Sequence, residues 1–214
     1  AWNPVTGAAQ VATGEITLAP YESRVFATGS GAAPPAPTQT LTLQTGWTLT
    51  APDGKAQPVS DFGSWTRDPA LLHYSGSLTY SRTLRLTPAQ TKGHVMLDFG
   101  AGQPVPPPKR AMGSQALLDP PVREAAEIFV NGRRVGAVWT SPFTLDLSGY
   151  VKAGDNRLEA RVSNTAVNAL SGRPAPDYGP LTARYGERFS PQGMTNLVPL
   201  PSGLMTAPKL EIAP

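Results

Sequence analysis

Apolar and polar residues alternate with a period of two along several stretches of the chain. The segment 77–87 is typical, with leucine and tyrosine separated by serine, threonine and arginine. This period predicts strands with one buried face. No window keeps apolar residues at helical spacing over three turns; the segment 88–92 fits a single turn, and 121–128 suits a helix or a strand. Strands are expected in 41–49, 77–87, 94–99, 122–130, 133–139, 143–151, 157–162 and 207–214.

Turn residues separate these strands and define their pairing. Asn131-Gly132 supplies two residues that tolerate positive φ, which predicts a type I′ hairpin between the strands on either side. Gly136 in the returning strand allows a close approach of a neighbouring chain or a bulge. The 21 glycines and 24 prolines are spread along the chain, as expected where many turns join short strands. The pattern predicts an all-β fold, an antiparallel jelly-roll β-sandwich.

The composition of the first forty residues differs from that of the rest. Residues 1–28 contain short apolar runs around Ile16 and Phe26 that cannot form a core alone, so we interpret them as the terminal strands of a preceding β-domain. Residues 29–40 are small, polar and proline-rich, which is typical of a linker. The sandwich is expected to occupy 41–214, with the proline-rich segment 101–121 as an insertion loop.

Residue counts exclude several kinds of chemistry. The chain has no cysteine and only His73 and His94, which excludes disulfides, a thiolate nucleophile and a multi-histidine metal centre. The formal net charge of +3 is scattered and forms no basic stripe, so a nucleic-acid partner is not expected. No apolar run approaches the length of a membrane span, and the first residues do not have the pattern of a signal peptide.

A series of short motifs carries a family resemblance. These are "VNG" at 130–132, "VG" at 135–136, Trp139, "PF" at 142–143, Asp146, "GDNRL" at 154–158 and "VSN" at 162–164. Together they resemble the galactose-binding-like β-sandwich attached to many glycoside hydrolases. The tail, "YGERFSPQG" followed by "LPSGLMTAPKLEI", resembles the end of the α-L-rhamnosidases of glycoside hydrolase family 106. The loop 101–121 and the segment "TAVNALSG" at 165–172 depart from that family's pattern.

Candidate site residues follow from the chemistry of sugar binding and hydrolysis. Hydrolysis needs two facing carboxyl groups, and the resemblance places these in a separate barrel domain, so we expect no catalytic residue in this chain. Sugar rings stack on aromatic faces and bond to planar polar groups. Trp139 could instead pack in the core, as Trp47 should. The candidate carbohydrate-binding residues are Trp65, Tyr74, Trp139, Tyr185 and Arg188.

A structural Ca²⁺ ion is common in this class of sandwich and needs only oxygen ligands. Asp53, Asp61 and Asp68 stand in loops suited to it, without a diagnostic spacing.

The resemblance implies a non-catalytic accessory domain of a glycoside hydrolase, with the catalytic domain of the same parent enzyme as its partner and an oligo- or polysaccharide as a further ligand. Two alternatives stay open, a free-standing carbohydrate-binding module and a structural sandwich with no ligand. The resemblance further implies a bacterial protein that is periplasmic or secreted.

Overall fold

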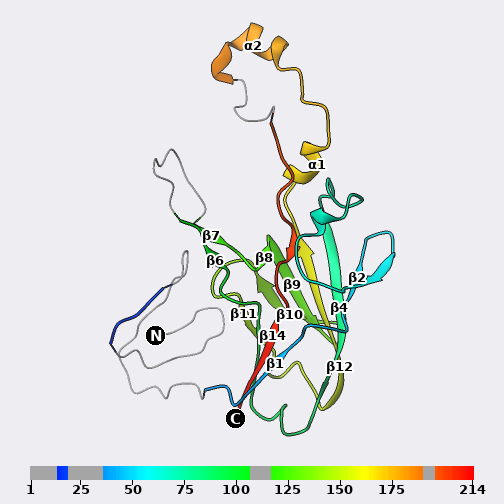
Figure 1. Cartoon of the computed structure of the whole chain (residues 1–214), viewed down its shortest axis with the longest axis vertical. Helices are drawn as coiled ribbons and strands as arrows, with labels where there is room; N and C mark the ends of the chain where they lie inside the picture. The colour runs from blue at the N-terminus through cyan, green and yellow to red at the C-terminus, as the bar shows by residue number, and fades with distance from the viewer. Residues whose placement is uncertain (1–13, 19–35, 107–116, 190–195) are drawn as a thin grey trace.

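The computed structural model describes residues 14–18, 36–106, 117–189 and 196–214. Two antiparallel sheets pack face to face, and a thinner extension that carries the helices projects from one end (Figure 1). The predicted antiparallel β-sandwich is confirmed. Most of the segment 1–28 lies outside the described residues, and the described residues 14–18 are exposed and form no strand. The first strand begins at Gln39, inside the segment predicted to be a linker.

The larger sheet has six strands in the order β10-β9-β12-β4-β2-β3. Its centre is the pair β12 and β4, which are aligned along their full length from Gly154 opposite Leu86 to Ser163 opposite Ser77. β10 and β3 form its two edges. The strands are β2 (Thr48–Thr50), β3 (Ala56–Pro58), β4 (Ser77–Leu86), β9 (Ala125–Val130), β10 (Arg133–Val138) and β12 (Gly154–Ser163).

The smaller main sheet has four strands in the order β1-β14-β5-β11. The closing strand β14 pairs with both β1 and β5, so it is an inner strand of this sheet. Two short ribbons, β13-β8 and β6-β7, complete the structure. These strands are β1 (Gln39–Thr42), β5 (His94–Asp98), β6 (Gln103–Pro104), β7 (Leu118–Asp119), β8 (Val122–Arg123), β11 (Thr144–Asp146), β13 (Gly203–Leu204) and β14 (Lys209–Ala213).

The core lies between the two main sheets and follows the predicted alternation. β4 and β12 each bury every second side chain along most of their length. Trp47 is 2% exposed, as expected for a core residue, and its indole N–H donates to the carbonyl of Leu43 at 2.7 Å. Removing such side chains from water is the main favourable term in folding. The largest fully buried side chains include Phe99, Leu78, Leu97, Ile128, Leu147, Leu158, Leu204 and Leu210.

The hairpin predicted at Asn131-Gly132 is confirmed. Asn131 has a φ of 52° and Gly132 a φ of 80°, and they join β9 to β10. The register of this pair shifts between Arg134 and Gly136, which confirms the bulge alternative for that glycine. A Cβ at Gly136 would lie 2.9 Å from Leu145 Cδ1, so a larger residue there would require the Leu145 side chain to shift. We call the end of the larger sheet that carries this hairpin the turn end.

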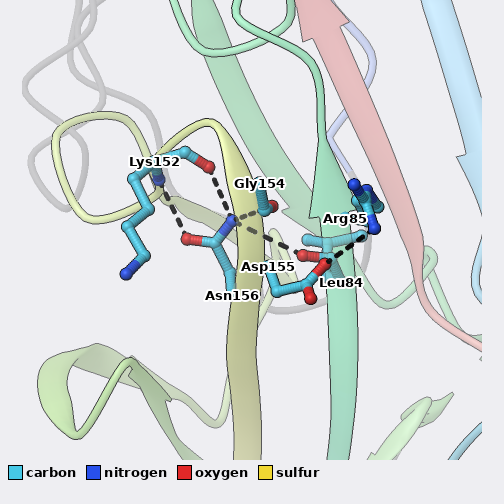
Figure 2. Close-up of polar contacts among 6 residues, drawn as sticks. All are labelled: Leu84, Arg85, Lys152, Gly154, Asp155 and Asn156. Carbon is cyan, nitrogen blue, oxygen red and sulfur yellow. Dashed lines mark hydrogen bonds and ion pairs between the residues drawn. The ribbon is translucent and has the colours of Figure 1, made fainter.

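Asn156 fastens the turn end from inside and is 1% exposed. Its Oδ1 accepts the N–H of Lys152 at 2.9 Å and the side-chain amide of Asn131 at 3.0 Å. Its Nδ2 donates to the carbonyls of Lys152 at 2.7 Å, Gly154 at 3.1 Å and Leu84 at 3.4 Å. Figure 2 shows the amide between the turn that precedes β12 and the neighbouring strand β4. The asparagines of the "VNG" and "GDNRL" motifs therefore meet, and they hold two turns together.

Short helices occur where the sequence showed only a weak pattern. They are η1 (Trp65–Arg67), α1 (Val167–Ser171), α2 (Gly179–Tyr185) and η2 (Glu187–Phe189). α1 and α2 are shorter than the three turns needed for a periodic apolar face, so the absence of helical periodicity did not exclude them. The ambiguous segment 121–128 forms β8 and the first part of β9.

Candidate functional site at the arm end

Opposite the turn end, one end of the sandwich carries long connections. Ser163, Ser77 and Ala125 lie side by side there, at the ends of β12, β4 and β9. We call this the arm end. From it, the described residues 172–189 and 196–199 project away from both sheets; they include α2, as the upper part of Figure 1 shows. We call this segment the arm; its described residues are 172–189 and 196–199.

A pair of side chain-to-backbone hydrogen bonds joins the two ends of the arm. Asn168 precedes the arm, is 0% exposed and donates from Nδ2 to the carbonyl of Leu200 at 2.8 Å. Its Oδ1 accepts the N–H of Leu200 at 3.4 Å. Its Nδ2 also lies 3.3 Å from Ser202 Oγ. The Asn168 side chain, at the start of the arm, therefore bonds to the Leu200 backbone, at its end, as a neighbouring strand would.

Asn164, the last residue of the "VSN" motif, connects the same base to the loop before β4. Its Nδ2 donates to the carbonyl of Tyr74 at 2.8 Å and to Ser202 Oγ at 3.0 Å, and its Oδ1 accepts the N–H of Gly76 at 2.9 Å. Ser75 Oγ adds a donor to the carbonyl of Thr165 at 2.8 Å. This network supplies hydrogen-bond partners to backbone groups that lie outside the paired strands, so it fixes the residues from which the arm begins and to which it returns, which we call the base of the arm.

A shallow cleft of about 300 Å³ opens beside the loop 57–71, next to β2 and β3. Arg67 and Asp61 stand at 4.0 Å from each other, and both side chains are largely exposed. The aromatic rings that line the cleft are buried: Trp65 is 5% and Tyr80 3% exposed. The cleft thus has charged groups in solvent but no open aromatic face on which a sugar ring could stack.

Trp65 and Tyr74 come together, with Trp65 buried and Tyr74 only partly buried. Their ring centroids lie 6.2 Å apart in an edge arrangement. Trp65 is 5% exposed, so a sugar could not reach its ring without a rearrangement. The Trp65 indole Nε1 has no hydrogen-bond partner. The Tyr74 hydroxyl donates to the carbonyl of Ser77 at 3.0 Å, and burial raises the pKa of Tyr74.

Trp139, unlike Trp65, is exposed to solvent. It follows edge strand β10, and its side chain is 69% exposed, so the alternative of core packing is wrong. Trp65 lies near β2 and β3, at the other edge of the larger sheet. Tyr185 and Arg188 belong to the arm, where Arg184 lies 5.2 Å from the Tyr185 ring centroid. The five sequence candidates therefore occupy three separate places and form no single sugar site.

The aspartates proposed as calcium ligands lie in separate local interactions. Asp53 pairs with Lys55 at 2.9 Å, and the hydrogen bond from Lys55 lowers the pKa of Asp53. Asp68 Oδ1 accepts the N–H of Ala70 at 2.9 Å, and Asp61 faces Arg67. In the part of the chain that the structure describes, no group of three or more His, Cys, Asp or Glu side chains is placed to hold a metal ion. Calcium binding stays a prediction from the sequence.

Carboxylates on the strands have structural partners. Glu127 pairs with Arg134 at 2.9 Å across the β9–β10 hairpin, and Glu159 pairs with Arg157 at 2.7 Å. Asp98 and Asp146 each accept a backbone N–H two residues further on, at 2.8 Å. These contacts keep the four groups on turns and sheet surfaces. Within the described ranges, no helix has the length and hydropathy needed to cross a bilayer.

Comparison with known proteins defines the class of protein to which this fold is similar. The rhamnosidase from Novosphingobium sp. PP1Y superposes with a TM-score of 0.55 at 26% identity, over 89% of this chain and 16% of that chain. The Faecalibacterium prausnitzii beta-glucuronidase gives a TM-score of 0.52 at 16% identity, over 82% of this chain and 31% of that one, which shows a likeness of fold alone. The structure is an all-β sandwich similar to domains found within glycoside hydrolases.

A sequence relative points to the same class. A protein named "Putative beta-glucuronidase" from Formosa agariphila is 30% identical over 111 residues, which are 51% of this chain and 8% of that protein. No protein-family model matches the chain. The chain therefore spans only a small part of the glycoside hydrolases to which it is similar.

Proposed function

We propose that this chain is a non-catalytic accessory domain of a glycoside hydrolase of the α-L-rhamnosidase type, and that it supports the catalytic domain of the same parent enzyme. One observation carries the proposal: 89% of this chain corresponds to only 16% of a rhamnosidase. A unit that fills so small a fraction of an enzyme leaves most of that enzyme, and with it the space for a catalytic domain, outside itself.

The rhamnosidase type is favoured over the glucuronidase type by the extent of the match. The rhamnosidase aligns over more of the chain, at 26% identity, than the Faecalibacterium prausnitzii glucuronidase does at 16%. The proposal includes a bacterial parent enzyme exported to the periplasm or the medium, where polysaccharide substrates occur. Cell fractionation with an antibody against this domain tests that part.

Contact with an oligo- or polysaccharide is a second candidate function, and the exposure of Trp139 supports it. An indole that is 69% exposed offers a flat apolar face to the C–H side of a sugar ring. In this version the domain holds polymer near the parent enzyme, or does so alone as a binding module. Isothermal titration calorimetry with rhamnose-containing oligosaccharides tests it, with Trp139→Phe as the variant that keeps a stacking face.

The main proposal is tested by locating the hydrolytic activity. The parent protein and the separate 214-residue chain, of 22.5 kDa, are each assayed on p-nitrophenyl α-L-rhamnoside. We expect turnover by the parent protein and none by the chain. Glu124→Gln, Glu127→Gln and Glu159→Gln in the parent protein should leave kcat within about twofold of the unaltered enzyme. A loss of about a hundredfold or more, the size expected for a lost general acid or base, would place the chemistry in this domain and overturn the proposal.

A further inference from the structure

Exposed apolar side chains are concentrated at the arm end and on the arm. Among the described residues, all the large hydrophobic side chains with high exposure lie there except Ile16, Leu18 and Leu117. Trp139 is 69% and Val198 66% exposed, whereas an ordinary soluble surface scatters such residues. The members of this set are Trp139, Leu170, Leu181, Tyr185, Val198 and Leu200.

No residue of the arm whose burial the structure describes is buried. α2 contains seven residues, none of them buried, and it stands away from both sheets in Figure 1. A single isolated helix of fewer than about 12 residues is marginal in water, so most of its stability must come from packing. Leu181, in the middle of α2, is 37% exposed. The described arm thus presents a helix whose packing surface lies outside the sandwich.

The base of the arm, in contrast, is held firmly. The bonds between Asn168 and Leu200 keep the two feet of the arm together, and Asn164 ties them to the loop before β4. Each of these side-chain amides fixes backbone groups before any partner arrives. Preorganisation of this kind lowers the entropic cost of association. A rigid base under a helix that has no buried residue is the arrangement expected for a docking element.

We propose that the arm end is the surface on which this domain docks to the remainder of its parent enzyme, with Trp139 and Leu181 buried in the contact. The occupant follows from the size of the relative: the rhamnosidase extends far beyond the 16% that this chain matches, so most of such an enzyme is available to cover the surface. The identity of the occupant rests on the proposed function. Aromatic residues at the centre of an interface commonly dominate its energy, which gives Trp139 the leading role.

Hydroxyl-radical footprinting of the full parent protein tests the proposal. Trp47, which is 2% exposed in the core, is the internal reference for a protected indole, and exposed His94 at the turn end is the reference for an accessible side chain. We expect Trp139 to oxidise as slowly as Trp47 while His94 reacts readily. Oxidation of Trp139 much faster than that of Trp47 would overturn the docking surface.

A matched pair of variants provides the second measurement. Leu181→Asp places a charge in the proposed contact, and His94→Asp places the same charge at the turn end. Because truncating or charging an interface anchor weakens it strongly, we expect tryptic cleavage after Arg184 to become about tenfold faster in Leu181→Asp and to stay unchanged in His94→Asp. Equal cleavage rates in the two variants would contradict the proposal.

The remaining outcomes separate the docking surface from the proposed function. Protection of Trp139 that disappears on dilution, together with a halved mass in solution, would assign the surface to a second copy and overturn the proposal. A parent protein that protects Trp139 but hydrolyses no rhamnoside or glucuronide leaves the docking surface in place and refutes the glycoside hydrolase assignment. An active parent enzyme in which Trp139 is freely oxidised supports the glycoside hydrolase assignment and refutes the docking surface.

Discussion

The two ends of the sandwich both hold the connections between their strands with asparagine side chains, but they differ in the packing around them. At the turn end, Asn156 and Asn131 join two tight turns, and the connections are short. At the arm end, Asn168 and Asn164 do similar work for long connections, yet the apolar side chains beyond them stay in solvent. A buried asparagine therefore marks a fixed backbone in both places. What distinguishes the ends is whether the residues outside the network have anything to pack against.

Among the two hydrogen-bond networks, the larger effect should follow from removing the Asn156 side chain at the turn end. Asn156→Ala leaves the N–H of Lys152 and the amide of Asn131 without their acceptor in a partly buried site. Each lost partner costs about 1–3 kcal/mol, so we expect the free energy of unfolding to fall by about 3 kcal/mol. Urea denaturation measures it. Asp155→Ala, which removes only an exposed ion pair with Arg85 at 3.9 Å, is the control. A similar loss in both variants would show that the amide is unimportant.

A smaller and more local effect is expected at the arm end. Asn168→Ala removes the bonds to Leu200, and we expect a loss of about 2 kcal/mol or less in the free energy of unfolding. Because the arm projects from the sheets, the main result should be faster hydrogen exchange of the Leu200 amide and faster proteolysis within 172–189. If Asn168→Ala lowered stability as much as Asn156→Ala without loosening the arm, the two ends would be equivalent.

Alkaline pH should weaken the protein near the arm end. Burial raises the pKa of Tyr80, whose hydroxyl oxygen accepts the N–H of Leu204 in β13. A raised folded-state pKa means that its contribution to stability is complete below the ordinary tyrosine value of about 10 and is lost as the pH rises through the folded-state value. We expect a lower thermal midpoint above pH 10, and a weaker dependence on pH in Tyr80→Phe. An identical pH dependence in the two proteins would exclude Tyr80 as the cause.

The smallest effect on stability should come from Trp139. Exposed substitutions usually change the free energy of unfolding by less than about 0.5 kcal/mol, so Trp139→Ala should leave the denaturation curve of the separate chain almost unaltered. Trp47→Ala, in the core, should cost about 3–5 kcal/mol by the same measurement. A large loss in Trp139→Ala would mean that this indole supports the fold and is not held ready for a partner.

The sheets could be predicted from the sequence because their signals are local. Alternation over 77–87 and the pair Asn131-Gly132 each depend on neighbouring residues, and the sheet registers agree with them. The sites of the tryptophans could not be predicted in this way. Trp65 stands among polar loop residues but is buried and packs against Tyr74. Trp139 continues an apolar strand but emerges at a sheet edge. Exposure is decided by tertiary packing, which alternation does not record.

The helices and the base of the arm were still harder to predict from the sequence. α1 and α2 are too short for a helical period to be visible. The contact from Asn168 to Leu200 joins residues on either side of the arm. Asn168 itself stands in a segment that departs from the family pattern, so no motif drew attention to it. Only coordinates could show that this amide takes the place of a strand partner.

Joining the feet of the arm has an evolutionary consequence. Asn168 bonds to Leu200 and so joins the two ends of the arm. The packing of the sheets therefore depends on the positions of residues 168 and 200, and not on the number of residues between them. Lengthening a closed loop costs little, about 0.6 kcal/mol for each doubling. Insertions, deletions and exchanges between these two positions are therefore nearly free for the sandwich. Descendants of this chain can acquire new neighbours by rewriting one appendage while their folded scaffold is inherited unchanged.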